Sequence, residues 1–369
     1  MSAQSGNGNA PVGVWVGQAE WNSSREAVIE RSTQLGVVLV CDNTSGTATC
    51  FVLDSGEWVQ VQLEVVRLEA DYQKRQQGLF DVGYLRDRQV AVIGLGSGGG
   101  LIAAQLARCG IGRFQLVDFD RLEVHNIARH VCTLDDLGRR KTTAVADLLR
   151  RTHPKVDVET FDINVLENVS ALDEIVRVAD LVVVATDSEA SKSLINRACW
   201  RTGTPAVYGA AYDRGFGGDA FRCVPPDDAC YSCFQEQVGD VFSSAPHMGE
   251  VDYASIKDPT RFFAEPGLGI DIAFLSLLAS KMALLTLLRG TQSRLVDWPA
   301  NYVMWGNQAE WAFDKPLQAL FVDIPPFARC PVCDSDRYLA DALGEDLSRD
   351  EIDARAKQVL NSAKIVSRS

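Results

Sequence analysis

Residues 89–120 read QVAVIGLGSGGGLIAAQLARCGIGRFQLVDFD, and this stretch decides the fold. It opens on an apolar run of strand length, turns through glycines at 94–100 and continues with helical composition at 101–108. A second apolar run, at 114–117, ends on acidic residues. Glycines permit a tight turn and the close approach of a phosphate, and the N–H groups of a helix start point at that anion. The order of strand, glycine turn, helix, strand and acid predicts a nucleotide-binding βαβ unit.

The acid after the second run supports a bound nucleotide. Asp118 lies about twenty residues beyond the glycine turn, a spacing at which a carboxylate accepts hydrogen bonds from ribose hydroxyls. The alternative is a tight turn in a Rossmann-like domain that binds nothing, because glycines follow strands in many α/β proteins. The turn residues expected to contact the nucleotide are Gly94, Gly96, Ser97, Gly98 and Gly99.

Bulk composition limits the classes of function. The chain has 369 residues, enough for two domains. Its hydrophobic content of 46% and charged content of 23% are typical of a soluble globular protein. The net charge of −13 argues against a general nucleic-acid or anionic-membrane surface, but it leaves room for a local basic pocket that binds one nucleotide.

Nothing in the sequence predicts export or a membrane span. Residues 1–10 are polar and lack the regions of a signal peptide. The longest apolar run, 270–288, is interrupted by Asp271 and Lys281, so we expect a buried helix there. Ten cysteines without an export signal suggest reduced thiols, and we expect a cytoplasmic protein.

Changes in composition divide the chain into four parts. We expect disorder at 1–10, a small strand-rich domain at 11–70, a main α/β domain at 71–335 and a helical tail at 336–369, with an amphipathic helix at 347–365. The small domain is expected to be an antiparallel meander, because apolar runs in it alternate with turn residues. Nothing in it carries chemistry, so docking or structural completion is its default interpretation.

Strands and helices alternate in the main domain, which predicts a mostly parallel, doubly wound sheet. The predicted strands are 157–161, 181–185 and 205–209, with closing strands between 302 and 320, and the predicted helices are 142–151 and 189–200. Residues 238–268 contain scattered glycine and proline and predict a long loop, which is uncommon unless the loop is functional or mobile.

Polar residues beyond the strand ends point to adenylation chemistry. They follow carboxyl ends of predicted strands, where doubly wound sheets bind ligands. Two cations offset the charge of a triphosphate as its α-phosphorus is attacked, and a carboxylate can hold Mg²⁺ that bridges phosphate oxygens. A dinucleotide dehydrogenase needs neither, so an NAD-dependent oxidoreductase is the least favoured alternative. The set comprises Asp120, Asn126, Arg129, Lys141 and Asp187.

At these residues the sequence resembles the adenylating superfamily of ThiF, MoeB, HesA and the ubiquitin-activating enzymes, as a bacterial member. The resemblance extends over most of the chain, from residue 85 to residue 335. It implies a Rossmann-like adenylation domain that uses ATP. The motifs that carry it are 94–99, 118–120, 126–129, 136–138 with Lys141, 186–187 and two Cys-x-x-Cys pairs.

The resemblance also implies roles for single residues. Asp118 would bind the ribose of ATP, and Asn126 and Arg129 would contact its phosphates. Lys141 would contact phosphate near the transition state, and Asp187 would bind Mg²⁺. Arg129, Lys141 and Asp187 are therefore candidate catalytic residues.

Three further positions follow from the comparison with this superfamily. Relatives use an arginine from a segment before the glycine loop, often from the partner subunit, and Arg75 is the candidate here. The alternative for Arg75 is a solvated charge in a linker. His130 stands where relatives usually have glutamine, and Ser97 replaces a usual glycine. Relatives are commonly homodimers, so we expect a homodimer.

Two Cys-x-x-Cys pairs form the second strong motif. Cys230 and Cys233, with Cys330 and Cys333, supply four thiolates that suit tetrahedral Zn²⁺. A redox motif is the weaker alternative, because neither pair opens a helix after a thioredoxin-like strand. A closed four-thiolate site leaves no position for substrate, so the expected zinc is structural.

The sequence does not identify a covalent nucleophile. Many ubiquitin activators carry a catalytic cysteine in the crossover loop, but the matching segment at 261–269 has none. Cys132 lies nearest the predicted site, and Ser243 or Ser244 is the alternative, as an oxyester. The serine alternative lacks a base that the sequence places beside it.

These expectations combine into an ATP- and Mg²⁺-dependent enzyme that adenylates the C-terminal carboxylate of a ubiquitin-like protein and releases pyrophosphate. Analogy suggests a bacterial ubiquitin-like conjugation pathway, with a conjugating-enzyme-like partner and a role in antiviral defence. The alternatives are an enzyme resembling the microcin-maturing peptide adenylating enzymes, a sulfur-carrier adenylyltransferase, and a scaffold that binds a partner without catalysis.

Overall fold

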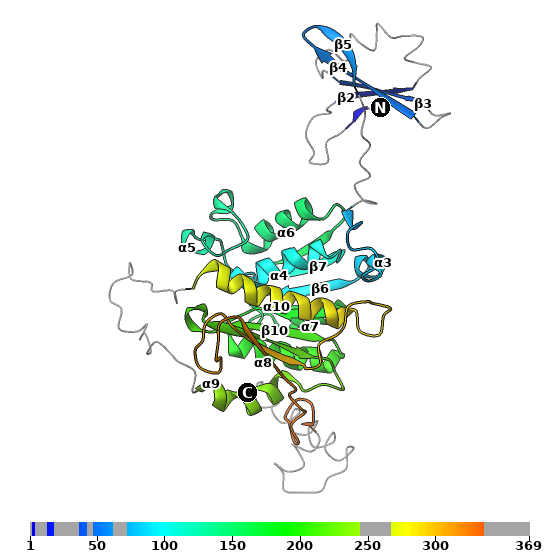
Figure 1. Ribbon diagram of the computed structural model, residues 1–369. Helices are drawn as coiled ribbons and strands as arrows, with labels where there is room; N and C mark the ends of the chain where they lie inside the picture. Colours follow the sequence, from blue (N-terminus) through cyan, green and yellow to red (C-terminus); the bar gives the residue numbers. More distant parts are fainter. Residues whose placement is uncertain are drawn as a thin grey trace, which may run out of the picture. The chain divides into compact units, whose positions relative to one another are not determined.

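The computed structural model in Figure 1 describes residues 2–3, 13–17, 37–42, 47–61, 72–243 and 267–335. These residues belong to two compact units, Met1–Tyr72 and Gln73–Ser369. The predicted tail helix at 347–365 and residues 244–266 of the predicted loop lie outside the described residues.

The amino-terminal unit is a five-stranded sheet in the order β1-β2-β3-β4-β5. Its strands are β1 Ser2–Ala3, β2 Gly13–Gly17, β3 Val37–Asp42, β4 Thr47–Asp54 and β5 Glu57–Val61. β3, β4 and β5 form an antiparallel meander, as predicted. The prediction is wrong at β2, which pairs with β3 in parallel, because residues 18–36 are long enough for the crossover that a parallel pair requires. β1 pairs with β2, so two residues expected to be disordered lie in a strand.

The second unit is built on an eight-stranded sheet in the order β13-β12-β11-β10-β9-β6-β7-β8. The strands are β6 Gln89–Ile93, β7 Arg113–Val117, β8 Asp157–Phe161, β9 Leu181–Val184, β10 Ala206–Ala211, β11 Gly217–Cys223, β12 Tyr302–Gly306 and β13 Gln318–Val322. The strands from β10 to β8 pair in parallel, and those from β10 to β13 pair antiparallel. The predicted parallel order therefore holds up to β10.

Strand β11 is not predicted by the sequence analysis. β10 and β11 are joined by a short connection that contains the 3-10 turn Asp213–Gly215. A parallel strand needs a crossover of a dozen or more residues, so the chain instead turns back on itself. This hairpin ends the parallel half of the sheet.

Helices cover both faces of the sheet (Figure 1). Along β6, Val90 and Val92 pack into one core with α4, α6 and α10, whereas Ala91 and Ile93 pack into another with α7, α8 and α9. Strands buried on both faces are the mark of a doubly wound sheet, so the predicted fold class is confirmed. The helices are α3 Val82–Arg86, α4 Ser97–Arg108, α5 Val124–Ile127, α6 Lys141–Thr152, α7 Val169–Val178, α8 Glu189–Thr202, α9 Tyr231–Ser243 and α10 Gly269–Leu287, with a 3-10 turn at Leu134–Asp136.

Helix α9 corrects the start of the predicted long loop. The loop was expected from residue 238, but residues 238–243 continue the helix. Phe234 and Val238, one helical turn apart, are both buried in the core under the sheet. Their packing carries the helix through Gly239, which the composition alone suggested as a breaker.

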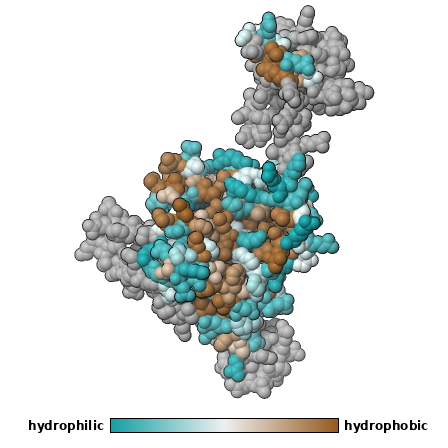
Figure 2. Space-filling model, viewed as in Figure 1, coloured by the Kyte–Doolittle hydropathy of each residue, from teal (hydrophilic) through white to brown (hydrophobic). Residues whose placement is uncertain are grey.

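Helix α10 is the long apolar helix of the described part of the chain. By length and composition alone it could cross a membrane, and no other described helix could. It packs against α4, β10 and β11, and its second half is buried, which confirms the predicted buried helix. Its first turn is exposed, with Leu268 68% and Ile270 72% accessible, and Figure 2 shows apolar side chains on this face of the second unit.

Two glycines fix the turn between β6 and α4. Gly94 has a φ of +91°, and a Cβ there would lie 2.5 Å from the Ala185 carbonyl oxygen. A Cβ on Gly99 would overlap the Gly94 carbonyl oxygen. A Cβ on Gly96 would meet no described atom within 4 Å. The start of α4 therefore lies directly against the strand backbone, at the carboxyl end of the sheet.

We predict that Gly99→Ala lowers the free energy of unfolding by at least about 3 kcal/mol, because the added methyl group forces α4 away from backbone that cannot yield. Urea denaturation followed by circular dichroism measures the change. Gly96→Ala is the matched control and should change stability by no more than about 1 kcal/mol, since its Cβ enters open space. Equal stability of the two variants would contradict the close backbone contact.

Candidate functional site

Two adjoining pockets open at the carboxyl end of the parallel strands. The first has a volume of about 240 Å³ and the second about 380 Å³, and Gly96, Lys141 and Asp187 line both. Among the other predicted residues, the first pocket is lined by Ser97, Gly98, Asn126 and Arg129, and the second by Gly94, Asp118 and Asp120. The structure thus brings together all of the predicted nucleotide-binding residues except Gly99. Gly99 instead packs against the backbone of Gly94.

One wall of the first pocket contains none of the predicted site residues. This wall consists of the end of β10, at 209–211, and of Ile272, Leu275 and Ser276 on α10. The small residues Gly209, Ala210 and Ala211 leave room beside the glycine loop, and their run after a predicted strand was the available signal. The helical wall has no local signal, because only tertiary packing brings α10 against α4.

Asp118 ties the glycine loop to the end of β7. Its Oδ2 accepts a hydrogen bond from the Leu95 N–H at 2.7 Å, and its Oδ1 accepts one from the Asp120 N–H at 2.8 Å. Each carboxylate oxygen has a second lone pair, so a ribose hydroxyl can still donate to it. Gly96 begins α4 without a side-chain cap, which leaves the first-turn N–H groups available to an anion.

Lys141 already has a partner in this structure. Its Nζ lies 2.8 Å from Asp120 Oδ2, and the lysine side chain is only 10% exposed. Lys141 is the first residue of α6, and its backbone N–H donates to the Asp120 carbonyl, so the two residues are joined twice. The ion pair holds the ammonium at the boundary of both pockets, where a phosphate would compete with Asp120 for it.

Asp187 is placed as a cation ligand would be. It follows β9, is exposed, and lines both pockets. Within the described residues, its carboxylate makes no hydrogen bond or ion pair with the protein. An oxygen ligand without a protein partner beside a phosphate cradle suits Mg²⁺, which prefers carboxylate oxygens and substrate phosphates.

A short turn carries Asn126 and Arg129 to the first pocket. The amide oxygen of Asn126 accepts from the Glu123 N–H at 3.0 Å and closes the start of α5, which leaves its NH₂ group to donate to a phosphate. The first residue of α10 fixes this turn from the other side, because a Cβ on Gly269 would lie 3.0 Å from the Ala128 carbonyl oxygen.

His130 joins the same turn to the glycine loop through a hydrogen bond to the Leu95 carbonyl. Its Nδ1 accepts from the Cys132 N–H at 3.0 Å, so its Nε2 carries the proton and donates to the Leu95 carbonyl at 2.8 Å. Burial lowers the pKa of His130, which keeps the imidazole neutral near pH 7. The side-chain amide of a glutamine could donate a hydrogen bond to the same carbonyl. Histidine can therefore replace the glutamine that the resemblance leads us to expect at this position.

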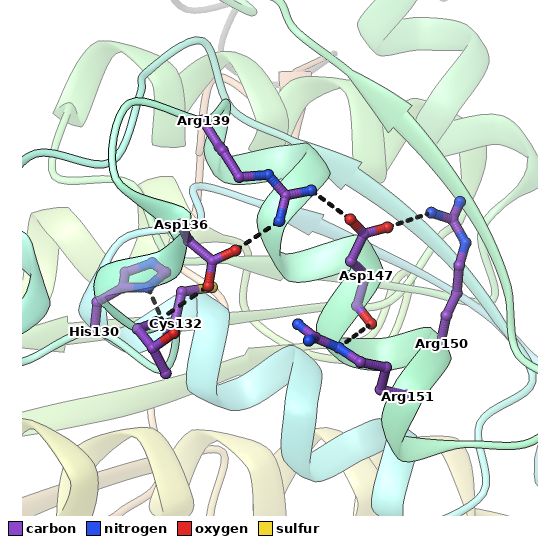
Figure 3. A network of polar contacts seen from close by, with 8 residues as sticks. His130, Cys132, Asp136, Arg139, Asp147, Arg150 and Arg151 are labelled. Carbon is purple, nitrogen blue, oxygen red and sulfur yellow. Dashed lines mark hydrogen bonds and ion pairs between the residues drawn. The ribbon is translucent and has the colours of Figure 1, made fainter. Parts of the chain in front are cut away.

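Cys132 is a poor nucleophile in this environment. It is 5% exposed, and burial together with the Asp136 charge raises the pKa of its thiol to about 12. Asp136 itself accepts from the Thr133 N–H and pairs with Arg139 at 2.6 Å, and Arg139 also binds Asp147 (Figure 3). The segment is held by an ion-pair network rather than arranged around a thiolate. The side chain of Ser243 and residue Ser244 lie outside the described part.

The structure does not bring Arg75 to the pockets. Gln73 and Gln76, on either side of it, donate to the Cys109 and Arg108 carbonyls at the carboxyl end of α4. The glycine loop is at the opposite end of this helix, about 18 Å away for twelve residues. Within one chain, the exposed Arg75 therefore takes no part in the site.

The four predicted metal-binding cysteines lie together. Their sulfur atoms lie within 4.8 Å of one another, with separations of 3.8 Å for Cys230–Cys233, 3.5 Å for Cys230–Cys330 and 3.3 Å for Cys233–Cys333. Tetrahedral Zn²⁺ with Zn–S bonds of about 2.3 Å separates its thiolates by roughly 3.8 Å. The Phe327 N–H also donates to Cys233 Sγ at 3.2 Å, which favours a thiolate. The cluster fits a closed structural zinc site between the start of α9 and the chain beyond β13.

The sequence profile of the ThiF family matches residues 74–307. The chain belongs to the ThiF family. The match contains every residue that lines the two pockets, together with Cys230 and Cys233, and it ends before Cys330. The predicted superfamily is therefore confirmed.

The chain is similar over about half of its length to proteins of known name. The chain is similar to ubiquitin-like modifier-activating enzyme 5 of Drosophila simulans, with 31% identity over 193 residues, which cover 49% of the chain and 45% of that protein. It is similar to the sulfur carrier protein adenylyltransferase of Thermus thermophilus, with 34% identity over 46% of the chain and 70% of that protein. The chain spans about half the length of the first of these relatives.

A solved structure confirms the fold. The crystal structure of E. coli MccB with succinimide superposes with a TM-score of 0.54 at 18% identity, covering 73% of this chain and 75% of that one.

We predict that His130→Gln makes stability less sensitive to acid. The folded chain lowers the pKa of this imidazole below its ordinary value, so the unfolded chain binds the proton more tightly and stability falls as pH drops below about 6.5. Unfolding free energies at pH 7.5 and 5.5 measure this. The wild type should lose more than His130→Gln, whereas His125→Gln, which removes an exposed imidazole, should follow the wild type. Parallel losses in all three proteins would contradict a neutral, buried His130.

We predict that the purified chain contains zinc and that Cys330→Ser removes it, because three thiolates cannot close the site. Metal analysis and thermal unfolding measure the change. The melting temperature should fall by at least about 10 °C, since structural zinc contributes folding free energy directly. Cys109→Ser, which removes a thiol outside the cluster, should keep both the metal and the melting temperature. Full zinc content in Cys330→Ser would rule out the four-thiolate site.

Proposed function

We propose that this ThiF-family chain is an ATP-dependent enzyme that adenylates the C-terminal carboxylate of a ubiquitin-like protein. The observation that carries the proposal is the arrangement of the first pocket. Arg129, Lys141 and Asp187, whose carboxylate has no partner among the described residues, line it together with the uncapped start of α4. Two cations, a metal-binding carboxylate and a helix N-terminus are what a triphosphate requires when its α-phosphorus is attacked.

The two pockets divide the nucleotide between them. The second pocket contains Asp118 and the apolar residues Ile163, Val165 and Leu166, so it suits the ribose and the base. The first pocket suits the phosphates and the incoming carboxylate. Mg²⁺, held through Asp187, would neutralise charge on the phosphate oxygens and orient the leaving group.

The chain needs to move no proton during adenylation. A substrate carboxylate oxygen forms the new P–O bond at the α-phosphorus, and the bond from that phosphorus to the bridging oxygen of the β-phosphate breaks. The electron pair leaves with pyrophosphate, so an acyl-adenylate and pyrophosphate are the products. Arg129 and the first-turn N–H groups of α4 would stabilise the charge that develops on the oxygens. Lys141 would exchange Asp120 for a phosphate oxygen.

A ubiquitin-like substrate is favoured by the names of the relatives, one of which is a ubiquitin-like modifier-activating enzyme and one a sulfur carrier protein adenylyltransferase. One name specifies activation of a ubiquitin-like modifier, and the other specifies adenylylation of a sulfur carrier protein. The raised pKa of Cys132 and the absence of a cysteine at 261–269 favour release of the adenylate without a thioester on the described residues.

A homodimer is part of the proposal. Arg75 lies at the wrong end of α4 to reach its own pocket, so its predicted phosphate contact requires a second copy of the chain. Exposed apolar side chains at Phe119, Val124 and Leu134, together with the first turn of α10, offer a surface for such a contact.

We predict that the chain exchanges labelled pyrophosphate into ATP only when a carrier with a free C-terminal carboxylate is present. Asp187→Asn should lower the exchange rate at least about a hundredfold, because the metal ligand that acts at the transition state is lost. Asp157→Asn is the matched control. Asp157 is an exposed carboxylate at the amino end of β8, whereas the pockets open at the carboxyl end of the parallel strands.

The carriers to compare are a ubiquitin-like protein, a sulfur-carrier protein and a short peptide, each with and without its terminal carboxylate. Exchange with the peptide alone would replace the proposed substrate with a peptide substrate. No exchange with any carrier, in a protein that binds ATP, would overturn the adenylating function in favour of a scaffold.

A further inference from the structure

A third pocket lies between the sheet and helices α8 and α9, outside the two nucleotide pockets. Its volume is about 390 Å³. Most of its wall is aromatic, and the rings come from Tyr208, Tyr212, Phe221, Tyr231 and Phe234. Its polar lining residues are Glu189, Lys192, Asp219 and Gln235. The adenylation chemistry proposed above uses none of these side chains.

Asp219 is the unusual group in this pocket. It lies in the middle of β11 and is only 6% exposed. Its Oδ2 accepts hydrogen bonds from the Tyr212 and Tyr302 hydroxyls, both at 3.1 Å, whereas its Oδ1 accepts none from the described residues. Burial raises the pKa of Asp219 to about 6. Asp219 lines the pocket, so its Oδ1 can accept a hydrogen bond from a donor outside the chain.

The other charges of the pocket compensate one another. Lys192 Nζ binds Glu189 Oε1 at 2.6 Å, and Tyr231 and Gln235 both donate to Glu189 Oε2, at 3.0 and 2.8 Å. Both oxygens of Glu189 are therefore occupied, and the ion pair carries no net charge. Lys192 also acts on the charge of Asp219, but one ammonium faces two carboxylates, so the three groups together carry a net charge of −1 and the pocket favours a cation.

The aromatic rings favour a cation as well. Tyr208 stacks on Tyr231 with ring centroids 4.4 Å apart, and Phe221 stacks on Phe234 at 4.8 Å. Ring faces attract ammonium and guanidinium groups, and they also pack against the aliphatic stem of lysine or arginine. A carboxylate within such walls is complementary to a long basic side chain.

The third pocket adjoins the site of adenylation. Gly209 and Ala210, at the end of β10, line both the first and the third pockets. Asp187 lines the first pocket, and Glu189, two residues later, begins α8 and lines the third. A polypeptide whose terminal carboxylate enters the first pocket therefore has the third pocket beside its preceding residues.

We propose that the third pocket binds a lysine or arginine side chain of the substrate polypeptide, close to its C-terminal carboxylate. The inference rests on the proposed function, which supplies a polypeptide terminus as the substrate. It adds a specificity determinant: the enzyme selects carriers that present a basic residue to Asp219.

The test uses fluorescein-labelled hexaglycine amides that carry one arginine, leucine or glutamate at each of the last four positions. Because an amide cannot be adenylated, binding is measured without catalysis, by fluorescence anisotropy with the full chain. At one position the arginine peptide should bind about tenfold more tightly than the leucine peptide. Asp219→Asn should abolish that preference, since the amide still accepts the tyrosine hydrogen bonds but carries no charge.

Two further variants make the outcome decisive. Glu236→Gln removes an exposed carboxylate of α9 outside the pocket and should keep the preference. Phe234→Leu removes one ring face at similar volume and should reduce the preference without changing binding of the leucine peptide. Equal binding of arginine and leucine peptides, or an unchanged preference in a folded Asp219→Asn, would overturn the inference. Pyrophosphate exchange tests the adenylating function separately, so either proposal can fail while the other stands.

Discussion

The backbone contact between Gly99 and Gly94 is the constraint on which the site depends. It allows α4 to begin against the end of β6, with no side chain between helix and strand. The helix start then lies at the carboxyl edge of the sheet, where Asp118 fastens the loop and Asp187 follows the neighbouring strand. Helix α10 packs along α4, so its position, and with it one wall of the first pocket, follows from the same contact.

The sequence predicts those parts of the site that depend on strand order. In a parallel sheet the residues that follow each strand meet at one edge, so Asp118, Asn126, Lys141 and Asp187 come together although they span seventy positions of the chain. The cysteine spacing likewise predicts a cluster that the structure forms. Local sequence patterns do not predict the hairpin at β11, because it depends on the length of one connection. They also do not predict which side chains the site residues bind.

Lys141 and Asp118 show why the partners of site residues cannot be predicted from the sequence. Lys141 was expected to face phosphate, yet in this structure it binds Asp120, and Asp118 binds the glycine loop. The ion pair satisfies the buried ammonium of Lys141, and the hydrogen bond satisfies one oxygen of the half-buried Asp118. The chain has a net charge of −13, and Lys141 at the first pocket is held in place by one of its acids, Asp120. In the proposed function, nucleotide binding would then exchange the partner of Lys141 rather than bury an unpaired ammonium.

The cysteine cluster has a consequence for the continuity of the chain. Two thiolates precede residues 244–266 and two follow them, and the pairing of β11 with β12 crosses the same interval. A single cut of the peptide backbone within this interval would leave two fragments that share the four-cysteine cluster and one continuous sheet. The second unit should therefore survive such a cut as a non-covalent complex, and two separately produced halves should reassemble when zinc is supplied.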